Sequence, residues 1–466
     1  MDARTKPAPE RGEAHTERPH AAQRCIDAAC GREHEIRERV YVCVECGAPL
    51  EIVVPKAASG NGTALRKIWE ARRGSLELRD RSGVWRFREL LPFDDAAPLI
   101  TLAEGNTPVY DAPRSAAYCG LGALRLKHQG CNPTGSFKDT GMTAAVTQAV
   151  VLGARTVVCA STGNTAASLA AYAARAGLQA AILLPHGQIT SSKLAQSMDY
   201  GAAVCEIDGN FDDCMKLIQE LGGDPSIYVA NSINPFRIEG QKTVAFELME
   251  QCAWRAPDHV VVPGGNLGNS SALGKGFSEL LALGLINRLP RLSVIQAEGS
   301  APLAHLFARL AGERSGSAEP LAKEIEPVVN PKTLATAIKI GSPVSWKKAL
   351  RTILDSCGQV ITVSEREIAD AKAMVGRDGI GCEPASATTV AGIRKLVASG
   401  HIRADEDVVA VLTGHVLKDP DYVSHYHRGT LAMEPGAQPL GGAFRNEPKR
   451  VAATKEAILR SLQGGK

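Results

Sequence analysis

From about residue 100 onward, short apolar runs alternate with longer amphipathic stretches. Each run is rich in β-branched residues, is bounded by turn signals and is followed by an Ala- and Leu-rich helical pattern. Strands that alternate with helices of this length predict parallel sheets covered on both faces. The predicted strands are Thr156–Ala160, Ala180–Leu184, Ala203–Ile207, Ile227–Ala230, His259–Val262, Leu292–Ala297, Gln359–Val363 and Val408–Leu412.

The number of strands favours two α/β domains with a cofactor cleft between them. Outside this region the pattern is different: a polar beginning, a cysteine-rich segment that ends in a strand-like run at Leu50–Val54, and a polar end. We therefore predict a disordered arm (1–22), a small extension (23–60), a large domain (61–130 and 241–435), a small domain (131–240) and a tail (436–466) with one helix near its end.

Composition narrows the possible partners. The 466 residues exceed a single ordinary core, and 53 Lys and Arg nearly balance 50 Asp and Glu. This balance gives no electrostatic case for binding nucleic acid or a membrane surface. No apolar stretch is long enough to span a bilayer. The polar, partly acidic beginning is neither a signal peptide nor a transit peptide, so a cytoplasmic location is expected.

Four of the twelve cysteines have the spacing of a zinc site. Cys25-x4-Cys30-x12-Cys43-x2-Cys46 would supply the four thiolates of a tetrahedral structural site, with no open position for chemistry. The alternative is four free thiols in a reducing compartment. The other eight fit buried, small apolar residues: Cys119, Cys131, Cys159, Cys205, Cys214, Cys252, Cys357 and Cys382.

The densest motif is the run from Asn132 to Met142, with Lys138 in it. Its proline and glycine suit a tight turn, and Ser136 can cap a helix that starts within residues 143–146. A lysine in the first turn lies near the positive end of the helix dipole, which lowers its pKa and suits an amine nucleophile or base. The alternative is a solvated surface lysine.

A glycine-rich loop follows the predicted strand at His259–Val262 and precedes a helical run. Its residues are Gly264, Gly265, Asn266, Leu267, Gly268 and Asn269. Such a turn can direct several backbone N–H groups at one phosphate, although it matches neither the Walker nor the dinucleotide fingerprint. The alternative is a purely structural turn.

Three further segments come directly after predicted strands. Residues 161–165 open a helix with hydroxyls and free N–H groups, which suits an anion, although simple N-capping by Ser161 or Thr162 is the alternative. Arg237 offers a planar fork suited to phosphate, but a lone arginine is usually a surface group. Thr413 can meet a ring nitrogen or simply close a turn.

Residues 132–142 resemble the cofactor-binding segment of the threonine synthases, which are pyridoxal 5'-phosphate (PLP) enzymes of fold type II. The glycine loop is similar to that of the long, plant-type members. Further similar stretches are Ala103–Pro108, Thr336–Trp346 and Glu383–Ala387, so the resemblance covers about residues 40 to 420. It implies an α/β fold of the tryptophan synthase β type, with PLP in the cleft between two parallel-sheet domains.

The resemblance also implies individual roles. Lys138 holds PLP as a Schiff base with Phe137 beside it, Asn164 contacts the phenolic oxygen and Thr413 the pyridine nitrogen. The residues implied for the PLP phosphate are Gly264, Gly265, Asn266, Leu267, Gly268 and Asn269. The substrate carboxylate and part of its phosphate are implied to bind Ser161, Thr162, Gly163 and Thr165, and the rest of the phosphate Ser232, Asn234 and Arg237, with Lys193 as a further candidate.

The implied reaction converts O-phospho-L-homoserine and water to L-threonine and phosphate by γ-elimination and β-addition of water. A homodimer is also implied; plant-type members are activated by S-adenosylmethionine, whose site the sequence does not locate. The alternatives are another fold type II lyase, such as a cysteate synthase or a threonine dehydratase, and a catalytically inactive scaffold with a zinc-binding module. Thr140, Asn164 and Val416 depart from residues common in the family.

Overall fold

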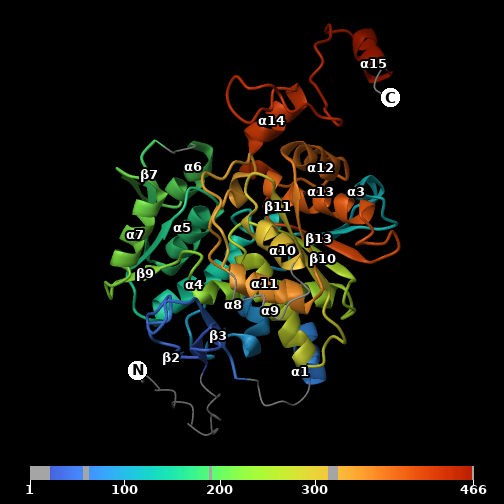
Figure 1. Ribbon diagram of the computed structural model, residues 1–466. Helices are drawn as coiled ribbons and strands as arrows, with labels where there is room; N and C mark the ends of the chain where they lie inside the picture. Colours follow the sequence, from blue (N-terminus) through green and yellow to red (C-terminus); the bar gives the residue numbers. More distant parts are fainter. Residues whose placement is uncertain (1–20, 56–61, 188–190, 313–323, 464–466) are drawn as a thin grey trace, which may run out of the picture.

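The computed structural model describes residues 21–55, 62–187, 191–312 and 324–463 (Figure 1). Nearly all of the predicted arm at 1–22 lies outside the described residues, so that prediction stays open. None of the described helices is long and apolar enough to cross a membrane. The domain boundaries that we predicted also remain predictions.

Two larger sheets organise the chain. The first is parallel, with strand order β8-β7-β6-β9: Ala203–Ile207, Gln179–Pro185, Thr156–Ala160 and Ile227–Val229. The second has the order β12-β11-β10-β13-β5-β4: Val360–Val363, Arg291–Ala297, His259–Pro263, Val408–Leu412, Arg125–His128 and Val109–Asp111. Only its edge strand β4 is antiparallel to its neighbour. The α/β class and the parallel sheets are therefore confirmed.

Helices cover both faces of these sheets (Figure 1). Those of the smaller sheet are α4 (Lys138–Val151), α5 (Asn164–Ala176), α6 (Ser191–Asp199) and α7 (Phe211–Leu221). The remaining described helices, not all of which cover a sheet, are α1 (Gly62–Arg72), α2 (Leu78–Arg81), α3 (Pro113–Cys119), α8 (Pro235–Gln251), α9 (Gly268–Ala282), α10 (Pro302–Gly312), α11 (Trp346–Asp355), α12 (Glu365–Arg377), α13 (Pro384–Ala398), α14 (Pro420–Arg428) and α15 (Lys455–Gln463). The predicted tail helix is α15.

Strand β10 shows why its residues form a central strand. Val260 and Val262 pack into the core on one face of the sheet, and Val261 packs into the core on the other. Successive side chains of a strand point to opposite faces, so a strand covered on both sides has to be apolar throughout. All eight predicted strands are present, with ends within one residue of the prediction.

The sequence did not predict β5, although it lies inside the sheet between β13 and β4. Its residues are Arg-Leu-Lys-His, and Lys127 is fully buried. The Lys127 ammonium forms an ion pair with Glu247 and donates to the Gln251 side chain at 2.9 Å and to the Thr107 carbonyl at 2.7 Å. Because these partners come from elsewhere in the chain, the strand reads as polar in isolation.

The small N-terminal sheet has the order β2-β1-β3, with strands at Glu33–Glu35, Ala22–Cys25 and Leu50–Val53. The predicted strand-like run is therefore confirmed as β3. Among the other cysteines, the expectation of burial was wrong for Cys131, Cys205 and Cys357, which are exposed. Cys205 lies on the edge strand β8, and Cys357 sits in a turn with a left-handed backbone (φ +54°), where little covers them.

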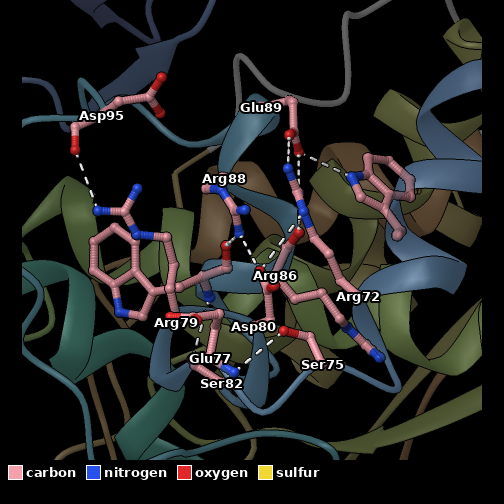
Figure 2. Close-up of polar contacts among 12 residues, drawn as sticks. Arg72, Ser75, Glu77, Arg79, Asp80, Ser82, Arg86, Arg88, Glu89 and Asp95 are labelled. Atoms are coloured by element: carbon pink, nitrogen blue, oxygen red, sulfur yellow. Dashed lines mark hydrogen bonds and ion pairs between the residues drawn. The ribbon is translucent and has the colours of Figure 1, made fainter.

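An ionic network fastens α1 and α2 to the 3-10 helix η1 (Trp85–Leu90), as Figure 2 shows. Arg72 donates to Glu89 at 2.9 Å and to the Arg86 carbonyl at 2.6 Å, while Arg88 donates to Asp80 at 2.6 Å. The bidentate fork of arginine lets one side chain join two elements in this way. The helices at the beginning of the chain are thereby fixed against the large sheet's core.

Helices α4 and α8 touch backbone to backbone at Gly141 and Gly240. A Cβ at Gly240 would overlap the Thr140 carbonyl oxygen, and one at Gly141 would lie 2.8 Å from the Arg237 carbonyl oxygen. Only glycine allows this approach, which brings the beginnings of the two helices together. Lys138 and Arg237 lie at those beginnings.

We expect Gly240→Ala to destabilise the protein by about 1–3 kcal/mol, because the new methyl group collides with rigid backbone. Gly376→Ala is the control: Gly376 is also helical, and a Cβ there would meet nothing within 4 Å. Denaturant unfolding of both variants measures the difference. A Gly240 variant as stable as the Gly376 variant would contradict the close packing of α4 on α8.

Candidate active site

The turn that carries Lys138 is fixed to the carboxyl end of β13. The Phe137 amide donates to the Thr413 carbonyl at 2.9 Å, and the His415 amide donates to the Gly135 carbonyl at 2.9 Å. An isolated bridge between Ser136 and Gly414 lies between these two bonds. Segments about 275 residues apart are thereby held side by side, and the predicted site residues Lys138 and Thr413 come together.

The predicted helix start was wrong. Helix α4 begins at Lys138 and not within residues 143–146; its N-cap is Phe137, without a side-chain capping bond, and Ser136 is therefore not the N-cap. The earlier start follows from Asp139, which accepts from the Thr134 amide at 2.7 Å and the Thr134 hydroxyl at 2.6 Å and so closes the turn. Lys138 is nevertheless in the first turn, as predicted.

The Lys138 amine is poised to be neutral near physiological pH. Burial, and then the positive charge of Arg237, lower the pKa of Lys138 to about 7, against an opposing effect of Glu383. Its Nζ lies 4.2 Å from the centre of the Phe137 ring. Desolvation is therefore the main cause of the low pKa, whereas the sequence pointed to the helix dipole. A neutral amine is what a nucleophile or a base requires.

Glu383 joins two of the predicted cofactor residues and was missed as a site residue. Thr413 Oγ1 donates to one carboxylate oxygen at 3.0 Å, and Asn164 Nδ2 donates to the other at 2.9 Å. The carboxylate is 1% exposed and directly precedes α13. The only signal for it in the sequence was its place in the family-like stretch Glu383–Ala387, because its partners lie 30 and 219 residues away.

The glycine loop presents unused N–H groups. Among the hydrogen bonds of the described residues, none uses the amides of residues 265–270, which lead into and begin α9. Leu267 has a left-handed backbone (φ +65°), and a Cβ at Gly264 would lie 2.6 Å from Val294. A strained turn held tightly against β11, with a row of free amides at a helix start, is suited to bind a phosphate.

The side chains of this loop have different roles. The side-chain Nδ2 of Asn266 donates to Ser232 Oγ at 3.0 Å, and its side-chain Oδ1 accepts from the backbone N–H of Val344 at 2.9 Å. The Asn266 side chain therefore links the loop to the segment between β9 and α8. The Leu267 side chain packs in the core. Asn269 is buried, and neither of its side-chain polar atoms has a partner in the described part of the chain. A buried polar group without a partner is uncommon, and a bound ligand is one way to satisfy it.

Arg237 is a buried cation without an acidic partner. It is 2% exposed, donates to the Ala230 carbonyl at 3.2 Å, and has no carboxylate within ion-pair distance among the described residues. Its Nε has no hydrogen-bond partner in the described ranges, and burial lowers the pKa of Arg237 to about 10. Leaving a buried guanidinium unpaired is costly, so an anion is expected at this position.

The remaining predicted substrate residues are placed as follows. Asn234 is fully buried and serves as the N-cap of α8; its oxygen accepts from Phe236 at 3.0 Å and its amide donates to Val229 at 2.7 Å, which indicates a structural role. Residues 161–165 are half-buried at the start of α5. The capping alternative was wrong, since the N-cap is Gly163. Lys193 lies on α6, but its side chain is outside the described residues.

These residues fit the expected cofactor. An amine with a lowered pKa suits an aldehyde, and the free amides and the orphaned Asn269 suit a phosphate at the other end. Thr413 and Asn164, oriented by Glu383, are polar groups available for a ring between those ends.

Comparisons with known proteins agree with this geometry. The pyridoxal-phosphate-dependent enzyme family matches residues 100–414. Threonine synthase from Methanocaldococcus jannaschii is 46% identical over 86% of this chain and 93% of its own length. Threonine synthases from Mycobacterium leprae (46%; 72% of this chain, 88% of the relative) and Synechocystis sp. (42%; 78% and 89%) are similar as well.

Solved structures show the same fold at low identity. Threonine deaminase isoform 2 from Solanum lycopersicum superposes with a TM-score of 0.57 at 18% identity, over 80% of this chain and 94% of that one. Diaminopropionate ammonia lyase from Escherichia coli gives 0.57 at 15%, over 77% and 91%. At this identity the likeness concerns the fold alone.

We expect Arg237→Met to raise the pKa of Lys138 above about 7, because it removes a positive charge that disfavours the ammonium form. In the wild type the amine should become reactive as the pH rises through about 7, well below the range of an exposed lysine. Competitive acetylation of the cofactor-free protein across pH, read by mass spectrometry, measures the pKa of Lys138 in the wild type and in Arg237→Met.

The control is Arg288→Met. Arg288 pairs with Asp258 at the amino end of β10, whereas the glycine loop follows its carboxyl end, so this substitution should leave the pKa of Lys138 unchanged. A Lys138 that acetylates like an exposed lysine in the wild type, or identically in both variants, would refute the electrostatic coupling.

Proposed function

Because the chain belongs to the pyridoxal-phosphate-dependent enzymes and, within them, to the threonine synthases, we propose that it converts O-phospho-L-homoserine and water to L-threonine and phosphate. It is thus a PLP-dependent lyase of threonine biosynthesis. The resemblance to the long, plant-type members remains a prediction, since the relatives described above are archaeal and bacterial.

One observation carries the choice of a phosphorylated substrate: the buried, unpaired guanidinium of Arg237 lies close enough to lower the pKa of Lys138. The amine expected to bind the cofactor and the guanidinium expected to bind an anion therefore lie near each other. A substrate without a phosphate would leave the Arg237 charge uncompensated, which argues against a dehydratase. Ser232, tied to the glycine loop through Asn266, adds a neutral partner for the same anion.

The residues of this chain would divide the work as follows. Bound PLP withdraws electrons from the α carbon of the amino-acid substrate. Lys138, as a neutral amine, would accept a proton from that carbon and then one from the β carbon. It would deliver a proton to the γ carbon after phosphate leaves, and return one to the α carbon after water has added at the β carbon. Arg237 and Ser232 hold the substrate phosphate, so that its departure from the γ carbon leaves the anion in a prepared site.

The cofactor itself would be oriented by the fixed groups around it. The amides of 265–270 and Asn269 receive its phosphate, while Glu383 fixes Asn164 and Thr413 toward its ring. Residues 161–165, at the start of α5, would receive the substrate carboxylate. Groups held in place before the reaction contribute mainly by orientation and by replacing water.

We further propose that the N-terminal sheet binds one structural zinc ion. The four sulfur atoms of Cys25, Cys30, Cys43 and Cys46 lie within 4.8 Å of one another, and two pairs are 3.4 and 3.7 Å apart. A tetrahedron with Zn–S bonds of about 2.3 Å has edges of about 3.8 Å. The left-handed Gly31 and Gly47 support the tight turns that such cysteine pairs use.

We also propose a cytoplasmic location and a homodimer. Twelve cysteines that form no disulfide suit a reducing compartment such as the cytoplasm. The homodimer follows from the family resemblance.

We expect the purified protein to release phosphate and L-threonine in equal amounts from O-phospho-L-homoserine, and Lys138→Ala to lose at least about 10³-fold in kcat. Coupled assays of both products measure this, with Lys347→Ala as a control on the surface of α11. Ammonia release from L-threonine without threonine formation would instead show a dehydratase and overturn the proposal.

We expect about one zinc ion per chain by atomic spectroscopy, reduced well below one in Cys43→Ser. Cys205→Ser is the control, because that thiol is exposed and distant in the fold. Chelation should unfold the N-terminal sheet at lower temperature than the catalytic core, because binding to the folded site is linked to its stability. Zinc-free protein with an unchanged unfolding profile would contradict the site.

A further inference from the structure

A cavity of about 320 Å³ lies away from the candidate active site. It is enclosed by α12, by α14 and by residues 444–446 of the tail, in the orange and red region at the top of Figure 1. None of the residues assigned to the cofactor or the substrate lines it. Its volume is at the lower end of the range for small-molecule sites.

The lining of this cavity carries positive charge only. Lys372, Arg377 and Arg445 contribute cations, His427 adds an imidazole, and no aspartate or glutamate is among the lining residues. Two of the cations are held in place: the Arg377 guanidinium lies 4.9 Å from the centre of the Phe444 ring, and Arg445 forms an ion pair with Glu447 at 3.0 Å. Three cations around one space suit a small anion.

Lys372 is the observation that points to a ligand. It is only 8% exposed, and within the described ranges no hydrogen bond or ion pair satisfies its ammonium group. Burial lowers the pKa of Lys372, and electrostatic interactions with Cys382 and Asp419 oppose this lowering. The hydroxyl of Tyr422, another lining residue, is also buried, with no hydrogen-bond partner in the part of the chain that the structure describes. Elsewhere in this protein a buried lysine such as Lys127 is paired with a carboxylate.

We propose that this cavity binds the phosphate group of a small molecule, either free phosphate or a small phosphate ester. A phosphate dianion matches several cations around one space, and its oxygens can accept from both an ammonium and guanidinium groups. The aromatic walls at Tyr422, Tyr426 and Phe444 leave an apolar side for the organic part of an ester.

Such a ligand would touch the segment that positions the active-site carboxylate. Gly381 and Cys382 line the cavity, and Glu383 is the next residue. The backbone of Cys382 forms an isolated antiparallel β-bridge with the backbone of His415, which follows Thr413 and Gly414. Occupancy of the cavity therefore bears on the backbone that holds both Glu383 and Thr413, and the site is a candidate for regulation.

The test is equilibrium dialysis of the PLP-loaded protein with inorganic phosphate. Because the proposed catalytic site also takes phosphate, the comparison is between the wild type and Lys372→Met, in which only the second site is changed. The wild type should bind one more phosphate per chain than Lys372→Met, or bind it roughly tenfold or more tightly at that site. Arg366→Gln, an exposed residue of the same helix with the same change in charge, should bind like the wild type.

Folding of the variant is checked independently. In phosphate-free buffer Lys372→Met should be at least as stable as the wild type, because it removes an unpaired buried charge, and added phosphate should raise the Tm of the wild type more than that of the variant. Phenyl phosphate that displaces inorganic phosphate from the Lys372-dependent site assigns the site to esters, and failure to displace it assigns the site to free phosphate. Equal phosphate binding by the wild type and Lys372→Met overturns the proposal.

Discussion

The contact between the Lys138 turn and the end of β13 is the constraint on which the site depends. Two backbone hydrogen bonds, from Phe137 to Thr413 and from His415 to Gly135, join the beginning of α4 to the central strand of the larger sheet. These bonds fix the segment that carries the Lys138 amine relative to the segment that carries the Thr413 hydroxyl, before any ligand is bound. The Glu383 carboxylate accepts hydrogen bonds from both Thr413, which follows β13 of the larger sheet, and Asn164, which begins α5 beside the smaller sheet. One carboxylate therefore orients both side chains.

The sequence predicted those parts of the fold that short-range patterns determine. Strands such as His259–Val262 are apolar on both faces, and this pattern can be recognised from the local sequence without knowing which strands lie beside them. Strand β5 was missed because the charge of Lys127 is neutralised by Glu247, which is 120 residues distant. For the same reason Glu383 was not recognised in the site, and the start of α4 was placed too late because the Asp139 turn depends on side-chain bonds.

Two contrasting sets of charged side chains lie away from water in the described part of the chain. Lys127, Arg86 and Lys242 are each paired with a buried glutamate, which makes them part of the framework. Arg237 and Lys372 have no ion-pair partner among the described residues, and each lies where we place an anionic ligand. Since an uncompensated charge away from water is expensive, we infer that the first set holds the structure and that the second set binds ligands.

The contact of Gly141 with Gly240 has a consequence for the choice of substrate. Since the backbones of α4 and α8 touch, rigid helices fix the backbone positions of Lys138 and Arg237 relative to each other. A longer or shorter substrate would therefore have to be accommodated by these two side chains, because the helices cannot move closer together.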